Sequence, residues 1–198
     1  MLLTGVHSLG FSNYQEYLNE WKSSLNLCKP SMHAFFELAF HKHTEERLWF
    51  DLNEWKKALQ GAGWNTVVLT LDYAKRHPLY KTFRTVFVEA HHSTKPCDQM
   101  CFYRWLAMAS TSDGGWMSDY DTYPLNMHQN YEHGFDLPNN GSFTSNLYFI
   151  PNLISGSKSE WNRMASLLLA NHKRHTHGFW SNMLGLQDII QIDPSTHK

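Results

Sequence analysis

Two aspartates, Asp119 and Asp121, stand two positions apart, directly after an apolar stretch that begins at Trp116. If the chain turns after the first of them, both carboxylates can converge on one cation, and hard oxygen ligands of this kind suit Mg²⁺ or Mn²⁺. An ion held there would bridge to the phosphates of a substrate and neutralise charge that develops on a departing diphosphate. A solvated acidic strand end has the same pattern, so the pattern alone leaves both interpretations open.

The sequence around the aspartates extends this pattern. Arg104 lies on an expected helix, and a Gly-Gly turn follows it. Pro124 stands three residues after Asp121. In this order, residues 104–124 resemble the sugar-binding region of DXD-containing glycosyltransferases. These are nucleotide-sugar transferases of GT-A fold, and they include the α-mannosyltransferase type and the glucosylating bacterial toxins. A looser resemblance extends over residues 32–190.

The resemblance implies a metal-dependent glycosyltransferase of the hexosyltransferase type. It would move a sugar from a nucleoside-diphosphate sugar, expected to be a UDP-sugar, to a carbohydrate or glycoprotein acceptor, with retention of configuration. Asp121 would ligate Mn²⁺ or Mg²⁺ directly, and Asp119 would bind the metal, directly or through water, and touch the ribose or sugar. Arg104 would reach the donor sugar or brace the aspartates, and Asn146 would offer its amide to sugar hydroxyls. The resemblance names no catalytic nucleophile.

The chain departs from the family at one position of this region. Many members carry an aspartate three residues before the helix arginine, where it can hold sugar hydroxyls, whereas this chain has Cys101 there. Asp98, one turn earlier, is the candidate substitute. The C-terminal metal or phosphate ligand of such enzymes has several candidates, which are His175, His177, Ser181 and His197. The donor sugar and the third metal ligand therefore stay open.

Three other interpretations compete with a glycosyltransferase. A HAD-type phosphatase also uses Asp-x-Asp after an apolar strand, but it needs Thr or Val two residues past the second aspartate, where Tyr123 stands. A catalytically inactive carbohydrate- or nucleotide-binding relic of the same fold is the main alternative, favoured by the compact length and by Cys101. In a plain α/β interaction domain the aspartates would bind nothing. Metal-dependent turnover would separate an enzyme from both non-catalytic proteins.

The elements that must position these residues follow from hydrophobic periodicity. Buried strands are predicted over residues 32–40, 64–71, 143–150 and from Trp116 onward, and helices over 45–60, 97–110, 181–190 and after a Ser157/Glu160 capping box. Residues 82–90 fit either a helix or a strand. This alternation predicts an α/β fold with a mostly parallel central sheet flanked by helices, which the resemblance specifies as the Rossmann-like GT-A fold. Ligands of such sheets bind beyond the carboxyl ends of the strands. We expect the long polar segment 126–142 to form the acceptor side or a lid.

The length of 198 residues predicts a single domain, with an N-terminal helical extension over residues 1–31 and the core over 32–198. The chain has 17 Lys plus Arg against 18 Asp plus Glu, a net charge of -1. It therefore lacks the excess of positive charge that is typical of nucleic-acid-binding domains. It shows no apolar run long enough for a membrane span and no signal-peptide pattern at its start. A cytoplasmic location and a secretory-pathway lumen both stay open, because an anchor could lie outside this sequence.

The three cysteines predict no disulfide framework. Cys97 and Cys101 are four residues apart and would share one face of a helix. Their simplest interpretation is a pair of small buried hydrophobic residues, and a metal-binding pair is the alternative.

Overall fold

The computed structural model describes residues 30–38, 45–89, 95–123, 137–175, 179–192 and 194. The contacts within the chain divide it into two units, Met1–Pro30 and Ser31–Lys198, and the described residues belong almost entirely to the second. The predicted N-terminal helical extension lies outside the described residues, apart from Pro30 and Ser31. The strands and helices of the described chain all belong to the second unit.

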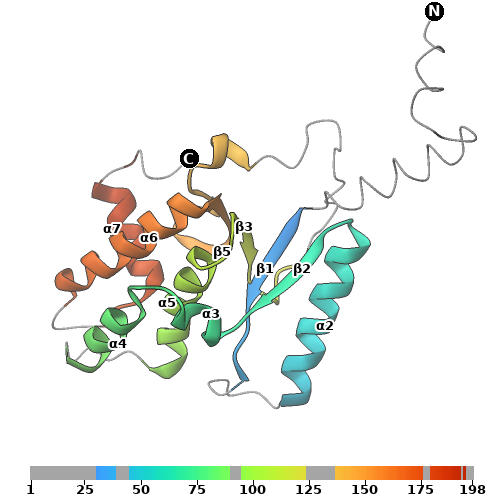
Figure 1. Cartoon of the computed structure of the whole chain (residues 1–198), viewed down its shortest axis with the longest axis horizontal. Coiled ribbons are helices and arrows are strands. Elements are labelled where there is room, and N and C mark those ends of the chain that lie inside the picture. Colours follow the sequence, from blue (N-terminus) through green and yellow to red (C-terminus); the bar gives the residue numbers. More distant parts are fainter. Residues whose placement is uncertain are drawn as a thin grey trace, which may run out of the picture. The chain divides into compact units, whose positions relative to one another are not determined.

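Five strands of the described chain form one sheet in the order β2-β1-β3-β5-β4 (Figure 1). The strands are β1 (Ser31–Phe35), β2 (Asn65–Leu69), β3 (Gly114–Ser118), β4 (Thr144–Leu147) and β5 (Ile150–Ser157). β1 pairs in parallel with β2 and β3, whereas β5 pairs antiparallel with both β3 and β4. The sheet is therefore mixed, because β5 runs against its neighbours. The α/β prediction is confirmed, but the prediction of a mostly parallel sheet holds only in part.

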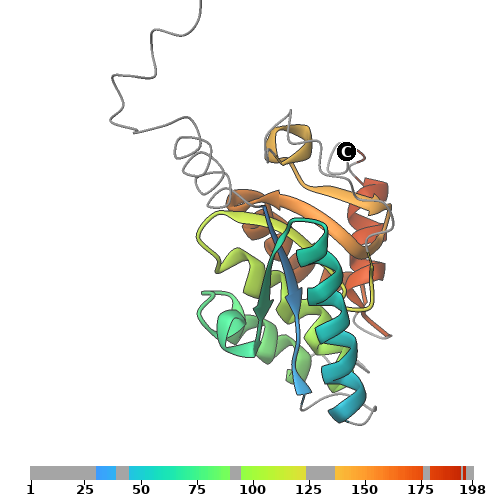
Figure 2. The ribbon, with the colours of Figure 1, turned by 90° about the vertical axis from the view of Figure 1, so that its right-hand side faces the viewer.

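Helices cover both faces of this sheet (Figures 1 and 2). They are α2 (Glu45–Gly61), α3 (Leu71–Lys75), α4 (Tyr80–Glu89), α5 (Pro96–Ala109), α6 (Lys158–Asn171) and α7 (Asn182–Ile192), with short 3₁₀ helices η4 (Pro138–Gly141) and η5 (His172–Arg174). α2 packs on one face, and the other α-helices build the core on the opposite face. The ambiguous segment 82–90 is helical, since it forms most of α4.

The side chains of each strand pack alternately into these two cores, because successive residues of a strand point to opposite faces of the sheet. In β1, Met32 and Ala34 are buried against α2, whereas Phe35 packs into the larger core on the other face. In β3, Trp116 faces the α2 side and Met117 the larger core. The carboxyl ends of β1 and β3 are thus held by apolar packing on both faces.

The predicted elements agree with the structure where the periodicity is strong. The apolar stripe expected on α2 is buried, and it consists of Leu48, Leu52, Trp55 and Leu59. Ser157 caps α6 by accepting a hydrogen bond from the Glu160 backbone N–H at 3.4 Å. The segment predicted as one strand over 143–150 is instead a hairpin, in which Leu147 pairs with Ile150. Tyr148 turns the chain there with a φ of 54°.

Candidate functional site

The order of the strands creates a crevice between β1 and β3. From β1 the chain crosses through α2 to β2, and from β2 it crosses through α3, α4 and α5 to β3 on the other side of β1. The two crossovers thus lead to opposite sides of β1, and open α/β sheets bind ligands beyond the carboxyl ends of the strands at such a point. A pocket of about 200 Å³ lies there, lined by Phe35, Glu37, Cys97, Met100, Cys101, Arg104, Ser118, Asp119 and Tyr120.

One wall of the pocket is a single face of α5. Its lining residues Cys97, Met100, Cys101 and Arg104 follow the i, i+3, i+4, i+7 spacing of one helix face. Pro96 starts the helix, where its missing N–H costs nothing. Residues 105–109 at the other end are buried in the larger core, which fixes the rotation of the helix. The predicted burial of both cysteines is wrong for Cys97, which is exposed.

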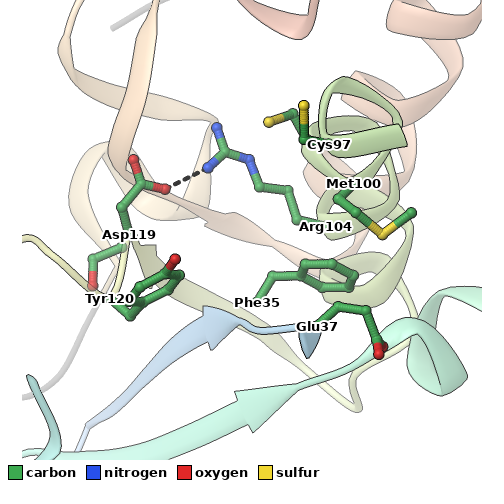
Figure 3. Close-up of a pocket in the computed structure, with 9 residues that line it drawn as sticks. Phe35, Glu37, Cys97, Met100, Arg104, Asp119 and Tyr120 are labelled. Carbon is green, nitrogen blue, oxygen red and sulfur yellow. Dashed lines mark hydrogen bonds and ion pairs between the residues drawn. The ribbon is translucent and has the colours of Figure 1, made fainter. Parts of the chain in front are cut away.

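An ion pair between Arg104 and Asp119 joins α5 to the end of β3 (Figure 3). The Arg104 Nη1 group donates to Asp119 Oδ1 at 2.5 Å, and the exposed fractions of the two side chains are 11% and 40%. Among the described residues, the buried Nε–H of Arg104 has no hydrogen-bond partner. A buried donor without a partner is costly, so the ion pair has to offset that cost. The sequence pattern placed these two residues in one site, and the structure brings them together.

The chain turns directly after Asp119, as convergence of the two aspartates requires. The Thr122 backbone N–H donates to the Asp119 backbone oxygen at 3.1 Å, which closes a turn that carries Asp121. Asp121 is exposed and does not line the pocket. Within the part of the chain that the structure describes, no group of three His, Cys, Asp or Glu side chains is arranged to hold a metal ion.

At the turn after β3 the donor set is therefore two carboxylates, those of Asp119 and Asp121. Arg104 contacts one oxygen of Asp119, which leaves the other oxygen of that carboxylate together with the exposed Asp121. Mg²⁺ typically uses one or two protein carboxylates and takes its other ligands from water and substrate phosphates. The residues present fit an ion that arrives with a phosphorylated substrate, and they do not form a complete protein cage.

Two titratable groups beside the ion pair, the Tyr120 hydroxyl and the Cys101 thiol, have raised pKa values. Burial and the carboxylates of Asp121, Asp51 and Asp119 raise the pKa of Tyr120 to about 12, so its hydroxyl stays protonated and can donate a hydrogen bond. The Tyr120 ring meets Phe36 edge to face, with 5.4 Å between ring centroids. Burial also raises the pKa of the Cys101 thiol. Tyr120 therefore contributes a neutral hydroxyl to the pocket rather than a negative charge.

Two pocket residues come from the end of β1, where the sequence analysis expected none. Phe35 is the last residue of β1, and the Glu37 carboxylate accepts a hydrogen bond from the Leu71 backbone N–H at 3.3 Å. The rule that ligands bind beyond the carboxyl ends of parallel strands could have identified both residues, had it been applied to the first strand as well as to β3. Tyr120 also lines the pocket, and the Asp-x-Asp pattern does not specify this middle residue.

The other two predicted donor-binding residues lie outside the pocket lining. Asp98 is in the first turn of α5, where its carboxylate accepts a hydrogen bond from the Lys95 backbone N–H at 3.1 Å. Asn146 is exposed on β4, and its Nδ2 group donates to the Leu153 backbone oxygen at 3.2 Å. β5 separates β4 from β3, which puts Asn146 about 10 Å from β3, or two strand spacings.

Two of the candidates for a third metal ligand, His175 and Ser181, are among the described residues, and both make hydrogen bonds to other residues. His175 Nε2 lies 2.9 Å from the Asp188 carboxylate on α7. Ser181 is buried and accepts a hydrogen bond from the Leu184 backbone N–H at the start of α7. His177, His197 and Pro124 lie outside the described residues, as does most of the predicted lid.

Comparisons of the chain with protein-family models, with curated proteins and with solved structures find no match. None of the described helices has the length and apolar character needed to cross a membrane. The features of the chain that bear on its function are therefore the sequence pattern of residues 104–124 and the geometry of the pocket.

Proposed function

We propose that the chain is a metal-dependent glycosyltransferase of GT-A type that takes a nucleoside-diphosphate sugar as donor, with a UDP-sugar as the first candidate. One observation carries the proposal. The Arg104–Asp119 ion pair stands at the carboxyl end of β3, inside a pocket at the point where the two crossovers lead to opposite sides of β1. Nucleotides and other phosphorylated ligands bind at such points in α/β sheets.

The two carboxylates after β3 would hold the metal. Asp121, carried by the turn, and the oxygen of Asp119 that faces away from Arg104 are the expected ligands for Mn²⁺ or Mg²⁺. When bound, the ion supplies compensation for the negative charge of the diphosphate leaving group. Arg104 acts on this site by holding the orientation of Asp119, since its guanidinium is mostly buried and already paired.

The size and lining of the pocket limit which part of a donor it can enclose. A volume of about 200 Å³ is below the roughly 300 to 1,000 Å³ typical of ligand pockets. One ring system, either the sugar or the base, would enter, and the rest of the donor would lie outside the described lining. Phe35 and Met100 give that ring apolar walls, and Tyr120 adds an uncharged hydroxyl to the lining.

A catalytically inactive carbohydrate- or nucleotide-binding protein of the same fold is the second candidate. Cys101 favours it, because it replaces the expected sugar-binding aspartate and lines the pocket with a neutral thiol. Asp98 does not restore that carboxylate at the pocket, because it contacts the Lys95 backbone. Such a protein would bind the donor and leave it intact.

Ligand-induced stabilisation tests the donor site. Nucleotide sugars would be screened by thermal denaturation with and without Mn²⁺, on the wild type, on Asp121→Asn and on a matched control, Asp113→Asn. Asp113 is an exposed aspartate just before β3, at the strand's opposite end. A ligand at about 100 times its dissociation constant adds about 2.7 kcal/mol, which for a chain of this length raises Tm by roughly 5 to 10 °C.

The expected shift needs both Mn²⁺ and one nucleotide sugar, disappears in Asp121→Asn and persists in Asp113→Asn. Release of nucleoside diphosphate from the stabilising donor then separates a transferase from a binding protein. A flat panel with a well-folded chain, or a shift that Asp121→Asn leaves intact, would refute the proposed donor site.

A further inference from the structure

The two cysteines on α5 are not explained by the proposed donor site. Both line the pocket, Cys97 is exposed and Cys101 is half-buried, and neither is in a disulfide. Figure 3 shows Cys97 on the same side of α5 as Arg104, above the guanidinium. A pair of cysteines needed only for packing would be buried in the core, so their position on a pocket wall calls for another role.

The geometry of a helix decides what two such thiols can do together. Side chains at i and i+4 have Cβ atoms about 5 to 6 Å apart. A disulfide requires Cβ atoms about 3.5 to 4.5 Å apart, so closing one would distort α5. A tetrahedral metal ion with bonds of about 2.3 Å to sulfur holds its two sulfur atoms about 3.8 Å apart. Two cysteines one turn apart can reach that separation by side-chain rotation alone.

We propose that Cys97 and Cys101 form a two-thiolate site for a soft divalent metal ion such as Zn²⁺. Thiolate ligands select Zn²⁺ and similar soft ions over the hard ions Mg²⁺ and Mn²⁺. Each thiol would release its proton to solvent as its sulfur binds, and solvent would supply the remaining ligands. The ion would be distinct in chemistry and in ligands from the one proposed at Asp119 and Asp121.

The surroundings of the two thiols have opposing effects on a bound cation. Burial raises the pKa of the Cys101 thiol and so opposes loss of its proton, which the bond to the metal ion would have to offset. Arg104 is the nearest cation on the same face of α5, and its charge is compensated by Asp119. The exposed position of Cys97 gives an ion access from solvent. An ion between the two sulfurs would stand at the wall of the pocket and reduce the space that a donor can use.

A Cd²⁺ titration of the full reduced chain tests the site, because cadmium thiolates have a characteristic ultraviolet charge-transfer absorption. The wild type is compared with Cys97→Ser, Cys101→Ser and a matched control, Cys28→Ser, which changes the remaining cysteine of the chain. We expect the absorption to saturate at one ion per chain, to be lost in Cys97→Ser and in Cys101→Ser, and to persist in Cys28→Ser. Zn²⁺ should displace Cd²⁺, and Mn²⁺ should not.

Three results would overturn the proposal. They are an absorption that survives in either Cys97→Ser or Cys101→Ser, an absorption that requires Cys28, and the absence of any absorption in the wild type. Thermal denaturation of the metal-free variants shows whether a loss reflects folding, and the exposed Cys97 should tolerate serine without a change in Tm. Because the readout needs no nucleotide sugar and Asp121→Asn should leave it unchanged, failure here is distinguishable from failure of the donor site. A disulfide mapped to Cys97 and Cys101 after mild oxidation would refute the geometric argument.

Discussion

Replacing Gly114 by alanine tests how closely β3 approaches the end of β5 and the start of α6. Gly114 has a φ of +82°, a conformation that strains an L-residue. A Cβ atom at this position would lie 2.5 Å from the Lys158 backbone nitrogen and 2.6 Å from the Gly156 backbone oxygen. Both neighbours are backbone atoms, so neither can move aside by a change of side-chain rotamer.

The magnitude follows from these two effects. A left-handed conformation costs an L-residue about 1 to 2 kcal/mol, and an overlap that forces the backbone to shift costs about 1 to 3 kcal/mol. Gly114→Ala should therefore reduce the free energy of unfolding by about 2 to 5 kcal/mol. For a domain of this length each kcal/mol lowers Tm by about 2 to 4 °C, so the expected loss is roughly 5 to 20 °C.

Urea denaturation and thermal melting measure this effect, with Gly61→Ala as the control. Gly61 is the last residue of α2, and a Cβ atom there would have no neighbour within 4 Å. Alanine at that position should be neutral or stabilising by up to about 1 kcal/mol. If Gly114→Ala melts within about 2 °C of the wild type, or behaves like Gly61→Ala, the close approach of the backbones is wrong.

Two further predictions concern the ion pair and a buried histidine. A double-mutant cycle of unfolding free energies with Arg104→Met and Asp119→Asn should give a coupling energy of about 1 to 3 kcal/mol. The coupling is expected because each single variant leaves the other side chain without its partner. Additive effects of the two substitutions would contradict the pairing. Burial lowers the pKa of His33 below its ordinary value of 6.5, so the unfolded chain takes up a proton at a pH where the folded chain does not. Stability should consequently fall as the pH is lowered from 7 through 6.5 toward the folded-state pKa. In His33→Gln this dependence should flatten, and parallel pH profiles of unfolding free energy for the two proteins would contradict the prediction.

Local patterns in the sequence were sufficient to predict much of the fold. The apolar stripe of α2 and the capping residues Ser157 and Glu160 are encoded within a few turns of helix, and both appear in the structure. The β4–β5 hairpin was not predicted, because its turn lacks the usual local signal in the sequence. Its turn uses Tyr148 at a positive φ, and such turns are normally marked by glycine or asparagine. The apolar residues on both sides therefore gave the pattern of one continuous strand.

The candidate site was predictable only where its residues are close in the sequence. Arg104 and Asp119 are 15 residues apart, and their pairing follows from one helix, one turn and one strand. Phe35 enters the same pocket from a strand far earlier in the chain, and its periodicity marks it only as an apolar strand residue. Asp98 shows a second limit of prediction from sequence. Its carboxylate accepts a hydrogen bond from the nearby Lys95 backbone N–H, whereas the sequence pattern assigned that carboxylate to a ligand. Which polar side chains remain available to a ligand depends on tertiary contacts that a linear pattern does not contain.

The central position of β3 makes the pocket dependent on completion of the sheet. β3 lies between β1 and β5 in the sheet. About half of the described chain connects β1 to β3, and β5 comes later in the chain, after β4. Met32 of β1 faces Trp116 of β3, and Trp116 in turn faces Ser155 of β5. Forming these pairings closes long loops, which is entropically demanding. A nascent or truncated chain that ends before β5 can form the β1–α2–β2 unit but lacks the partner that holds the other edge of β3. The ion pair and the pocket therefore belong to the fully assembled sheet, and ligand binding at this site would report that folding is complete.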